Sequence, residues 1–272
     1  MYEYTDGLHF IKKAENSFFL AQKDHVINVE AFKEGGVAEL LNKIEQCSED
    51  LGELAEVRVG LKTYQVGKGQ PSQTKKIKES RCFHSGKKVA QDYYKYLDGK
   101  NVCRYQLGWS GEYLKYGDHL AEPRKNFNLF SSHRILVRQI PAPPPYCIHA
   151  CAVSETYLND LNSMNIINMK ESPELLLGII NSRLISFWFV HKFGKLQRGT
   201  FPQFKVNELA MFPIAKNRNI HKSEIVRLVK KIMDAKASDL KTDIKKWEQQ
   251  IDQMVYELYG LAEEEVKIVE GN

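Results

Sequence analysis

Hydrophobic positions in the N-terminal part of the chain follow two different spacings. Residues 8–32 carry short apolar runs with polar breaks between them, a pattern that predicts short strands. Residues 38–47 place Leu40, Leu41 and Ile44 on one face of a helix. The second half of residues 51–64 alternates apolar and polar side chains, which predicts a half-buried strand. We therefore expect strands and helices to be mixed in this region.

Residues 134–140 (RILVRQI) have the composition of a buried strand. Arg134 and Arg138 fall on the same side of its pleat, because side chains alternate along a strand. These two arginines have two interpretations, as buried partners of carboxylates or as ligands of a bound partner. The proline-rich run at 141–146 ends the strand.

A long apolar segment begins at a typical helix start, with Ser172 as the cap and Pro173 in the first helical position. Apolar residues continue to about Lys192 and leave few exposed positions. We expect one central buried helix that ends near Gly194. Its apolar core at 175–190 is too short and too polar at its centre to cross a membrane, so we expect no membrane partner.

The chain beyond residue 216 has a helical pattern. A first helix begins near His221, and a second, over 239–258, carries apolar residues at alternating spacings of four and three, as in a short coiled coil. Gly260 is a suitable C-terminal cap, and 262–269 predicts a last helix. The fold class is therefore α/β (α+β), with mixed strands around a buried helix. We expect one domain over residues 1–216 and a C-terminal helical segment over residues 217–272.

Charge is unevenly distributed along this pattern. The whole chain has a net charge of +5, but residues 57–138 hold 17 Lys and Arg against 6 Asp and Glu, and also many aromatic residues. Such a region is either a face that attracts a polyanion or a solvated surface over an aromatic core. Residues 67–80 combine Gly, Pro and Ser with Lys75, Lys76 and Lys78 and predict a long loop, which is a candidate DNA contact.

Known catalytic motifs are absent from the sequence. There is no GxSxG, Walker A or GxGxxG motif, and the five cysteines show no paired metal-binding spacing, which is typical of a reduced cytoplasmic protein. The run PPPY at 143–146 lacks the polar first residue of an amino-methyltransferase motif. A nuclease-like Glu-x-Lys fragment, Glu265 to Lys267, lies on the predicted last helix. We expect no metal site and no catalytic residue on this chain.

Four segments together resemble the TaqI-like C-terminal specificity domain of type II restriction–modification enzymes and adenine-specific DNA methyltransferases. They are LGELAEVRVGLKT (51–63), YLDGKNVCRYQLGWSGEYLKYG with LAEPR (96–124), RILVRQI (134–140), and the long segment ELLLGIINSRL to AMFPI (174–214). The tail at 251–270 is also typical. The resemblance extends over roughly residues 15–270.

The resemblance implies a module that recognises duplex DNA and positions it for a methyltransferase or endonuclease domain or subunit located elsewhere. S-adenosylmethionine and Mg would belong to those catalytic domains, with no cofactor on this chain. Two alternatives remain open from the sequence: a protein-interaction subunit that uses the C-terminal helices, and a stand-alone metal-dependent nuclease.

The family's DNA-contacting loops vary, so contact residues are nominated here from charge and position alone. Lysines are suited to phosphates, and arginine forks to guanine edges. The nominated residues are Arg58, Lys62, Lys75, Lys76, Lys78, Arg81, Lys87, Lys88, Arg104, Arg124, Lys195 and Arg198.

Overall fold

The computed structural model describes residues 2–4, 8–10, 36–193 and 203–271. In the N-terminal part, β1 (Tyr2–Tyr4) pairs with β2 (Leu8–Phe10) in an antiparallel ladder. The other strands expected before residue 32, and the nominated Lys195 and Arg198, lie outside the described residues.

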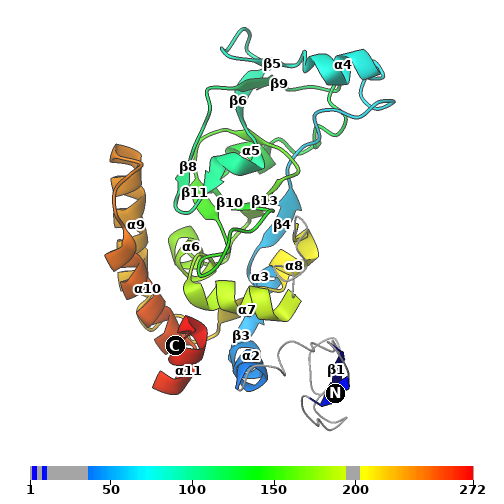
Figure 1. The fold of residues 1–272 in the computed structure, drawn as a ribbon. Coiled ribbons are helices and arrows are strands. Elements are labelled where there is room, and N and C mark those ends of the chain that lie inside the picture. The colour runs from blue at the N-terminus through cyan, green and yellow to red at the C-terminus, as the bar shows by residue number, and fades with distance from the viewer. Residues whose placement is uncertain (1, 5–7, 11–35, 194–202, 272) are drawn as a thin grey trace.

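The larger sheet lies at the centre of the molecule (Figure 1). Its strand order is β11 (Ala150–Val153), β10 (Arg134–Arg138), β13 (Ser163–Ile167) and β4 (Glu56–Val59), and all neighbours are antiparallel. The predicted buried strand at 134–140 is confirmed as β10, because its apolar residues are fully buried between two neighbours.

A second sheet forms the core of what we call the upper lobe, residues 61–97 and 111–131, at the top of Figure 1. Its order is β12 (Leu158–Asn159), β6 (Tyr93–Leu97), β9 (Tyr113–Lys115) and β5 (His84–Ser85), with only β12 and β6 parallel. Leu61, Leu114 and Phe130 lie in a hydrophobic cluster separate from the main core. This lobe also carries two short helices, α4 (Lys75–Ser80) and α5 (Asn128–Ser131).

Short elements complete the body of the protein. The expected amphipathic helix at 38–47 is confirmed as α2 (Val37–Gln46), with its apolar face buried. The strand expected in the second half of 51–64 is confirmed as β4. The remaining short elements are β3 (Ser48–Asp50), paired with β14 (Pro213–Ala215), α3 (Leu51–Leu54), η3 (Gly99–Asn101), β7 (Val102–Cys103), paired with β8 (Gln106–Leu107), and α8 (Val206–Ala210).

The single central helix expected from Ser172 to Lys192 is wrong in one respect. It is two helices, α6 (Pro173–Ile180) and α7 (Arg183–Phe193), bent by 58°. Asn181 causes the break, because its side chain bonds both the N–H and the carbonyl of Ala150 on β11. Ser182 then accepts a hydrogen bond from the N–H of Ile185 and starts α7. The predicted Ser172 cap is confirmed, since its hydroxyl accepts from the N–H of Leu175.

No single helix among the described residues is long and apolar enough to cross a membrane. The bent pair α6 and α7 meets the length and composition requirement only when its two helices are taken together. Most of the apolar residues of both helices are buried in the main core of the molecule.

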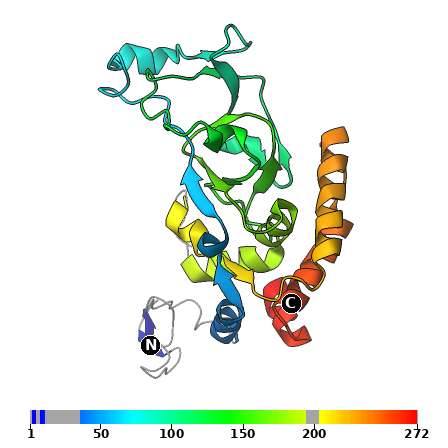
Figure 2. The ribbon, with the colours of Figure 1, turned by 180° about the vertical axis from the view of Figure 1, so that it is seen from behind.

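Three helices end the chain: α9 (Lys222–Ser238), α10 (Lys245–Leu258) and α11 (Glu263–Glu270). Figures 1 and 2 show α9 and α10 along one side of the sheet region. The second helix begins six residues later than the expected 239, so Leu240 lies outside it and is 59% exposed. The cap at Gly260 is confirmed by a left-handed φ of 63°.

The mixed α+β fold class is confirmed by these sheets and helices. Hydrophobic residues of α9, α10 and α11 belong to the same core cluster as those of α2, α6 and α7. The apolar stripe of α10, including Ile251 and Met254, is therefore used within the chain. The division at residues 216 and 217 remains a prediction, and the core extends across it.

Candidate nucleic-acid interface

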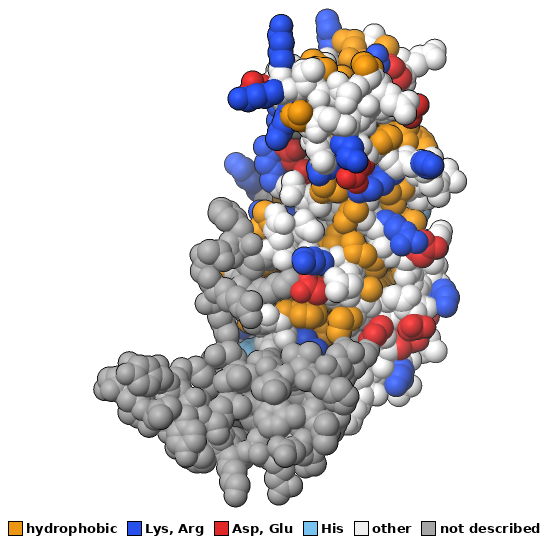
Figure 3. All heavy atoms as spheres, turned by 90° about the vertical axis from the view of Figure 1, so that its right-hand side faces the viewer, with side chains coloured by type: hydrophobic (Ala, Val, Ile, Leu, Met, Phe, Trp, Pro, Cys, Tyr) orange, Lys and Arg blue, Asp and Glu red, His pale blue; other side chains and the backbone are white. Residues whose placement is uncertain are grey.

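Exposed lysines concentrate on the upper lobe. Lys75, Lys76 and Lys78 lie on α4, and Lys87 and Lys88 lie on the turn after β5. Figure 3 shows Lys and Arg side chains gathered on the upper part of the face that it presents. Within the described part of the chain only Lys75 among these five forms an ion pair, at 3.7 Å from Glu79 and largely exposed. Unpaired ammonium groups of this kind are free to contact phosphates.

The loop expected over residues 67–80 is partly a helix. Residues 75–80 form α4, because Thr74 accepts a hydrogen bond from the N–H of Ile77 at 3.3 Å and caps the first turn. Arg81 ends the helix with a left-handed φ of 49°. Its guanidinium contacts Glu112 at 2.9 Å, so Arg81 is exposed but already has one acidic partner.

A second group of cations lies where the upper lobe joins the larger sheet. Lys62 and Glu122 exchange two backbone hydrogen bonds, which place the segment after β4 beside residues 122–125. Arg124 has a left-handed φ of 67°, and its Nε donates to the carbonyl of Gly60 at 2.8 Å. Arg58 is exposed on β4 and contacts Glu56. A positive φ at a non-glycine residue such as Arg124 strains the backbone, and strain of this kind is often found at functional sites.

Arg58 and Arg124 border a cleft of about 410 Å³ at the edge of β4. Lys125, absent from the nominated set, lies beside Arg124 and lines the cleft. In the sequence, Lys125 directly follows the nominated Arg124 in the run Pro-Arg-Lys at 123–125, and this position could have indicated it. We use the name basic edge for the cations on α4, those that line this cleft, and the two residues Lys62 and Arg81. Its members are Arg58, Lys62, Lys75, Lys76, Lys78, Arg81, Arg124 and Lys125.

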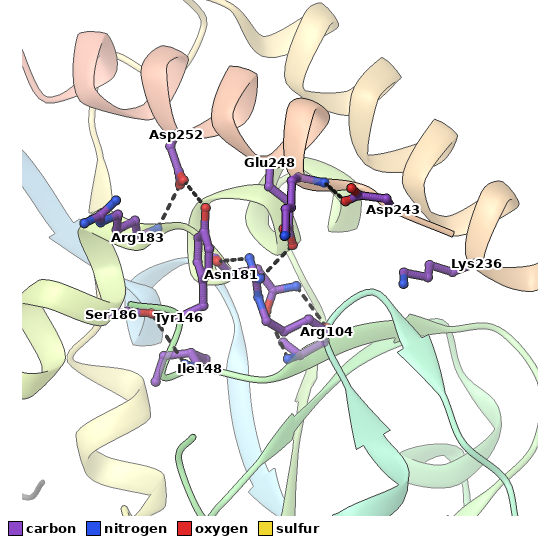
Figure 4. A network of polar contacts seen from close by, with 12 residues as sticks. Arg104, Tyr146, Ile148, Asn181, Arg183, Ser186, Lys236, Asp243, Glu248 and Asp252 are labelled. Carbon is purple, nitrogen blue, oxygen red and sulfur yellow. Dashed lines mark hydrogen bonds and ion pairs between the residues drawn. The ribbon is translucent and has the colours of Figure 1, made fainter. Parts of the chain in front are cut away.

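Arg104 is the nominated residue that the structure places elsewhere. Its Nη1 lies 2.6 Å from Glu248 Oε1 of α10, and its Nη2 donates to the carbonyl of Asn181 at 2.8 Å (Figure 4). The guanidinium also stacks over the ring of Tyr146 at 3.8 Å. Because this group is 14% exposed and has three internal partners, we remove Arg104 from the DNA-contacting set.

The same network connects α10 to the start of α7. Tyr146 donates to Asp252 Oδ2 at 2.7 Å, and Asp252 Oδ1 accepts from the backbone N–H of Arg183 at 2.8 Å (Figure 4). Burial raises the pKa of Asp252 to about 6, although these two donors favour the charged form. The network holds the C-terminal helices against the sheet and is remote from the basic edge.

Arg134 is fully buried, and its partners differ from either interpretation offered by the sequence. Its guanidinium donates to the carbonyls of Ser132, Glu155 and Tyr157 and to Asn165 Oδ1. No carboxylate is among these acceptors. Burial lowers its pKa to about 10. Arg134 therefore stabilises the junction of the two sheets from inside.

Most aromatic rings of the basic region pack against one another. Tyr105 is buried at 3% exposure, and Trp109 packs edge-on against Tyr113 and donates its Nε1–H to the carbonyl of Glu112. Phe127 contacts both Tyr94 and Tyr116. The interpretation of an aromatic core under a charged surface thus holds for these residues.

The family relationship rests on the segment that contains most of both sheets. Residues 94–214 match a family model described as the TaqI-like C-terminal specificity domain. Over these residues the chain is therefore similar to that family, as the sequence segments indicated. The match is shorter than the resemblance expected over residues 15–270, and α4 lies before it. A comparison with curated proteins gave no match.

Solved structures similar to this chain come from restriction–modification systems. The type IIL enzyme MmeI in complex with DNA is 10% identical over 82% of this chain, with a TM-score of 0.47. The type IIG endonuclease BpuSI is 11% identical over 81% of it, with a TM-score of 0.46. The HsdS subunit from Thermoanaerobacter tengcongensis is 8% identical over 81%, with a TM-score of 0.37. The similar region spans 36%, 32% and 50% of those chains.

The fragment Glu265 to Lys267 that resembled a nuclease motif has structural partners. Glu265 forms an ion pair with Lys43 and accepts from the N–H of Ala262 at the start of α11. Among the residues that the structure describes, no group of three or more His, Cys, Asp or Glu is arranged to hold a metal ion. The described residues thus give no evidence for the nuclease alternative.

His84, beside the specificity domain, makes the stability of the upper lobe depend on pH. Burial and the nearby Arg81 lower its pKa to about 4 from an ordinary value of 6.5. The folded state therefore keeps His84 neutral, whereas the unfolded state binds a proton below pH 6.5. This contribution to stability is complete above pH 6.5 and is lost as the pH falls toward 4.

We expect the free energy of unfolding of the natural protein, relative to that of a His84→Phe variant, to decrease between pH 7 and pH 5. A phenyl ring keeps the packing between Tyr64 and Tyr96 but does not titrate. Urea unfolding of both proteins at pH 7 and pH 5 measures this difference in the free energy of unfolding. The other titrating groups are the same in the two proteins, so their contributions cancel. If the free energy of unfolding changed equally in the two proteins, His84 would not be the source of the pH dependence.

Proposed function

We propose that this chain recognises a specific sequence in duplex DNA and serves as the specificity module of a type II restriction–modification enzyme. The observation that carries the proposal is the concentration of exposed cations on the upper lobe, part of which belongs to the segment that matches the TaqI-like specificity-domain model. DNA is the polyanion that such a domain would meet, and lysines without ion-pair partners lose little when they bind phosphates.

Two kinds of contact follow from the chemistry of the upper lobe and its basic edge. Exposed lysines such as Lys87 and Lys88 would neutralise phosphates, which gives affinity and strong salt dependence without sequence choice. Arg58 and Arg81 are exposed and carry planar forks that match the O6 and N7 atoms of guanine. Each now contacts a glutamate, so DNA would have to compete with that carboxylate.

The catalytic step would occur on another domain or subunit. S-adenosylmethionine for adenine methylation and Mg for cleavage would be bound there, and this chain would hold the duplex in the correct register for the reaction. The protein-interaction alternative rested on the apolar stripe of the C-terminal helices. That stripe is buried against the chain's own core, which removes its support.

The proposal is tested by selecting bound duplexes from a random library at two salt concentrations. We expect one short motif to be enriched and the affinity to decrease steeply with salt. Absence of binding at low salt would overturn DNA recognition. Salt-sensitive binding without enrichment would overturn autonomous recognition by this chain and would assign sequence choice to its catalytic partner.

A further inference from the structure

Helix α4 is unusual because packing does not hold it in place. None of its six residues is buried, and its apolar residue Ile77 is only partly covered. A helix of this length is unstable in water without tertiary contacts. Its position must therefore be determined by the segments on either side of it.

Gln73, two residues before α4, provides the main anchor. Its side chain is 2% exposed and makes three hydrogen bonds to backbone groups. Nε2 donates to the carbonyls of Thr63 at 2.9 Å and His119 at 2.7 Å, and Oε1 accepts from the N–H of Gln65 at 2.8 Å. A buried amide with all these partners fixes the chain to two neighbouring segments of the upper lobe, immediately before the Thr74 cap.

Further contacts fix the same segment, residues 65–82, which we call the arm. At Gly69 the φ is 85°, and a Cβ would lie 2.4 Å from the carbonyl oxygen of His119, so only glycine fits. At the two ends of the arm, the ring of Tyr64 stacks on Phe83 with centroids 5.2 Å apart, and its hydroxyl accepts from the N–H of Phe83. The arm is thus held at its base and internally at Gly69 and Gln73, while its helix projects (Figure 1).

The exposed helix is strongly basic. Lys75, Lys76 and Lys78 are exposed, and Lys76 and Lys78 form no ion pair within the described residues. Six helical residues have a length of about 9 Å, and a helix has a diameter of about 10 Å, which fits a B-DNA major groove of about 12 Å. Lysine at the groove floor donates to the O6 and N7 atoms of guanine.

We propose that α4 enters the major groove of the target DNA and reads base edges there, and that Gln73 is the positioning residue that fixes its angle to the sheet. This inference rests on the proposed function and names the element that would carry out the recognition. Lysines elsewhere on the lobe, such as Lys87 and Lys88, would contact only phosphates.

The first experiment separates base contact from phosphate contact. Motifs are selected from a random duplex library by the full chain and by Lys76→Gln, Lys78→Gln and Lys87→Gln variants. We expect Lys76→Gln or Lys78→Gln to change the preferred base at one or two positions of the motif, by roughly tenfold. Lys87→Gln, an equal loss of charge on the same lobe, should weaken binding and leave the motif unchanged. An unchanged motif in both α4 variants overturns the reading role.

The second experiment tests the position of the helix without changing its charge. Gln73→Leu removes all three anchoring hydrogen bonds, whereas Gln70→Leu alters an exposed glutamine of the same arm. We expect Gln73→Leu to reduce motif enrichment at least tenfold while the slope of affinity against salt stays near that of the natural protein. Gln70→Leu should leave both quantities unchanged.

Thermal unfolding of each variant identifies any loss of the fold. Gln73→Glu, which keeps the acceptor for Gln65 and loses both donors, is a second variant if Gln73→Leu does not fold. Enrichment that persists in a folded Gln73 variant overturns the positioning role alone. Failure of the natural protein to bind or select DNA overturns the proposed function instead, so the two outcomes are distinguishable.

Discussion

Replacing Lys68, Lys87 and Lys88 with glutamine is expected to weaken duplex DNA binding by roughly 10²- to 10³-fold at 0.1 M salt. Each ammonium that neutralises a phosphate adds about 0.9 to the slope of log affinity against log salt. All three side chains are exposed on the upper lobe and form no ion pair within the described residues. Fluorescence anisotropy with a labelled duplex at several salt concentrations measures both quantities, and the slope should fall by about 2.7.

The matched control changes Lys241, Lys245 and Lys246 to glutamine. These lysines are also exposed and lie in and beside the α9–α10 turn, and in Figure 1 these two helices lie on the other flank of the molecule from α4. The loss of net charge is identical in the two variants. We expect the control to bind nearly as tightly as the natural protein. Equal losses would show that net charge, rather than the upper lobe, attracts DNA.

Breaking the Arg104–Glu248 pair is expected to have the largest effect on stability. Both side chains are almost fully buried, and Glu248→Ala leaves the guanidinium without its carboxylate at 2.6 Å. Removing one partner of a buried ion pair costs about 3–5 kcal/mol of the free energy of unfolding. Urea unfolding followed by circular dichroism measures this cost.

A double variant distinguishes an unpaired charge from a general loss of packing. Arg104→Met combined with Glu248→Leu removes both charges and keeps much of the volume, so we expect it to recover most of the lost stability. Glu224→Ala, which breaks an exposed pair with Arg227 on α9, should change stability far less. A double variant as unstable as Glu248→Ala would show that the loss of stability comes from lost packing at this site and not from an unpaired charge.

Hydrophobic spacing predicted the elements that bury one face. It identified α2, β10 and the start of α6, because each has an apolar side that the core covers. It missed the break between α6 and α7, since Asn181 acts there through a contact with Ala150, 31 residues away. It also extended α10 back to Leu240, an apolar residue that is exposed in the fold.

Charge was a weaker guide to the candidate interface than spacing was to the fold. Arg104 and Arg124 are both basic residues in the same region, yet one is paired with Glu248 inside and the other lines a cleft at the surface. Only tertiary contacts separate them. Helix α4 has no apolar face to reveal it, and Gln73 resembles any polar residue of a loop until its three backbone partners are known.

The arm described above leaves the upper lobe at Tyr64 and returns at Phe83, and its two ends touch. Segments whose ends meet tolerate exchange and changes of length, because loop-closure entropy rises slowly with length and the rest of the fold is not displaced. Residues 65–82 therefore form a cassette. A chain that keeps the glutamine anchor and the stacked ring pair can acquire a different groove-facing helix, and with it a different target, without rebuilding either sheet.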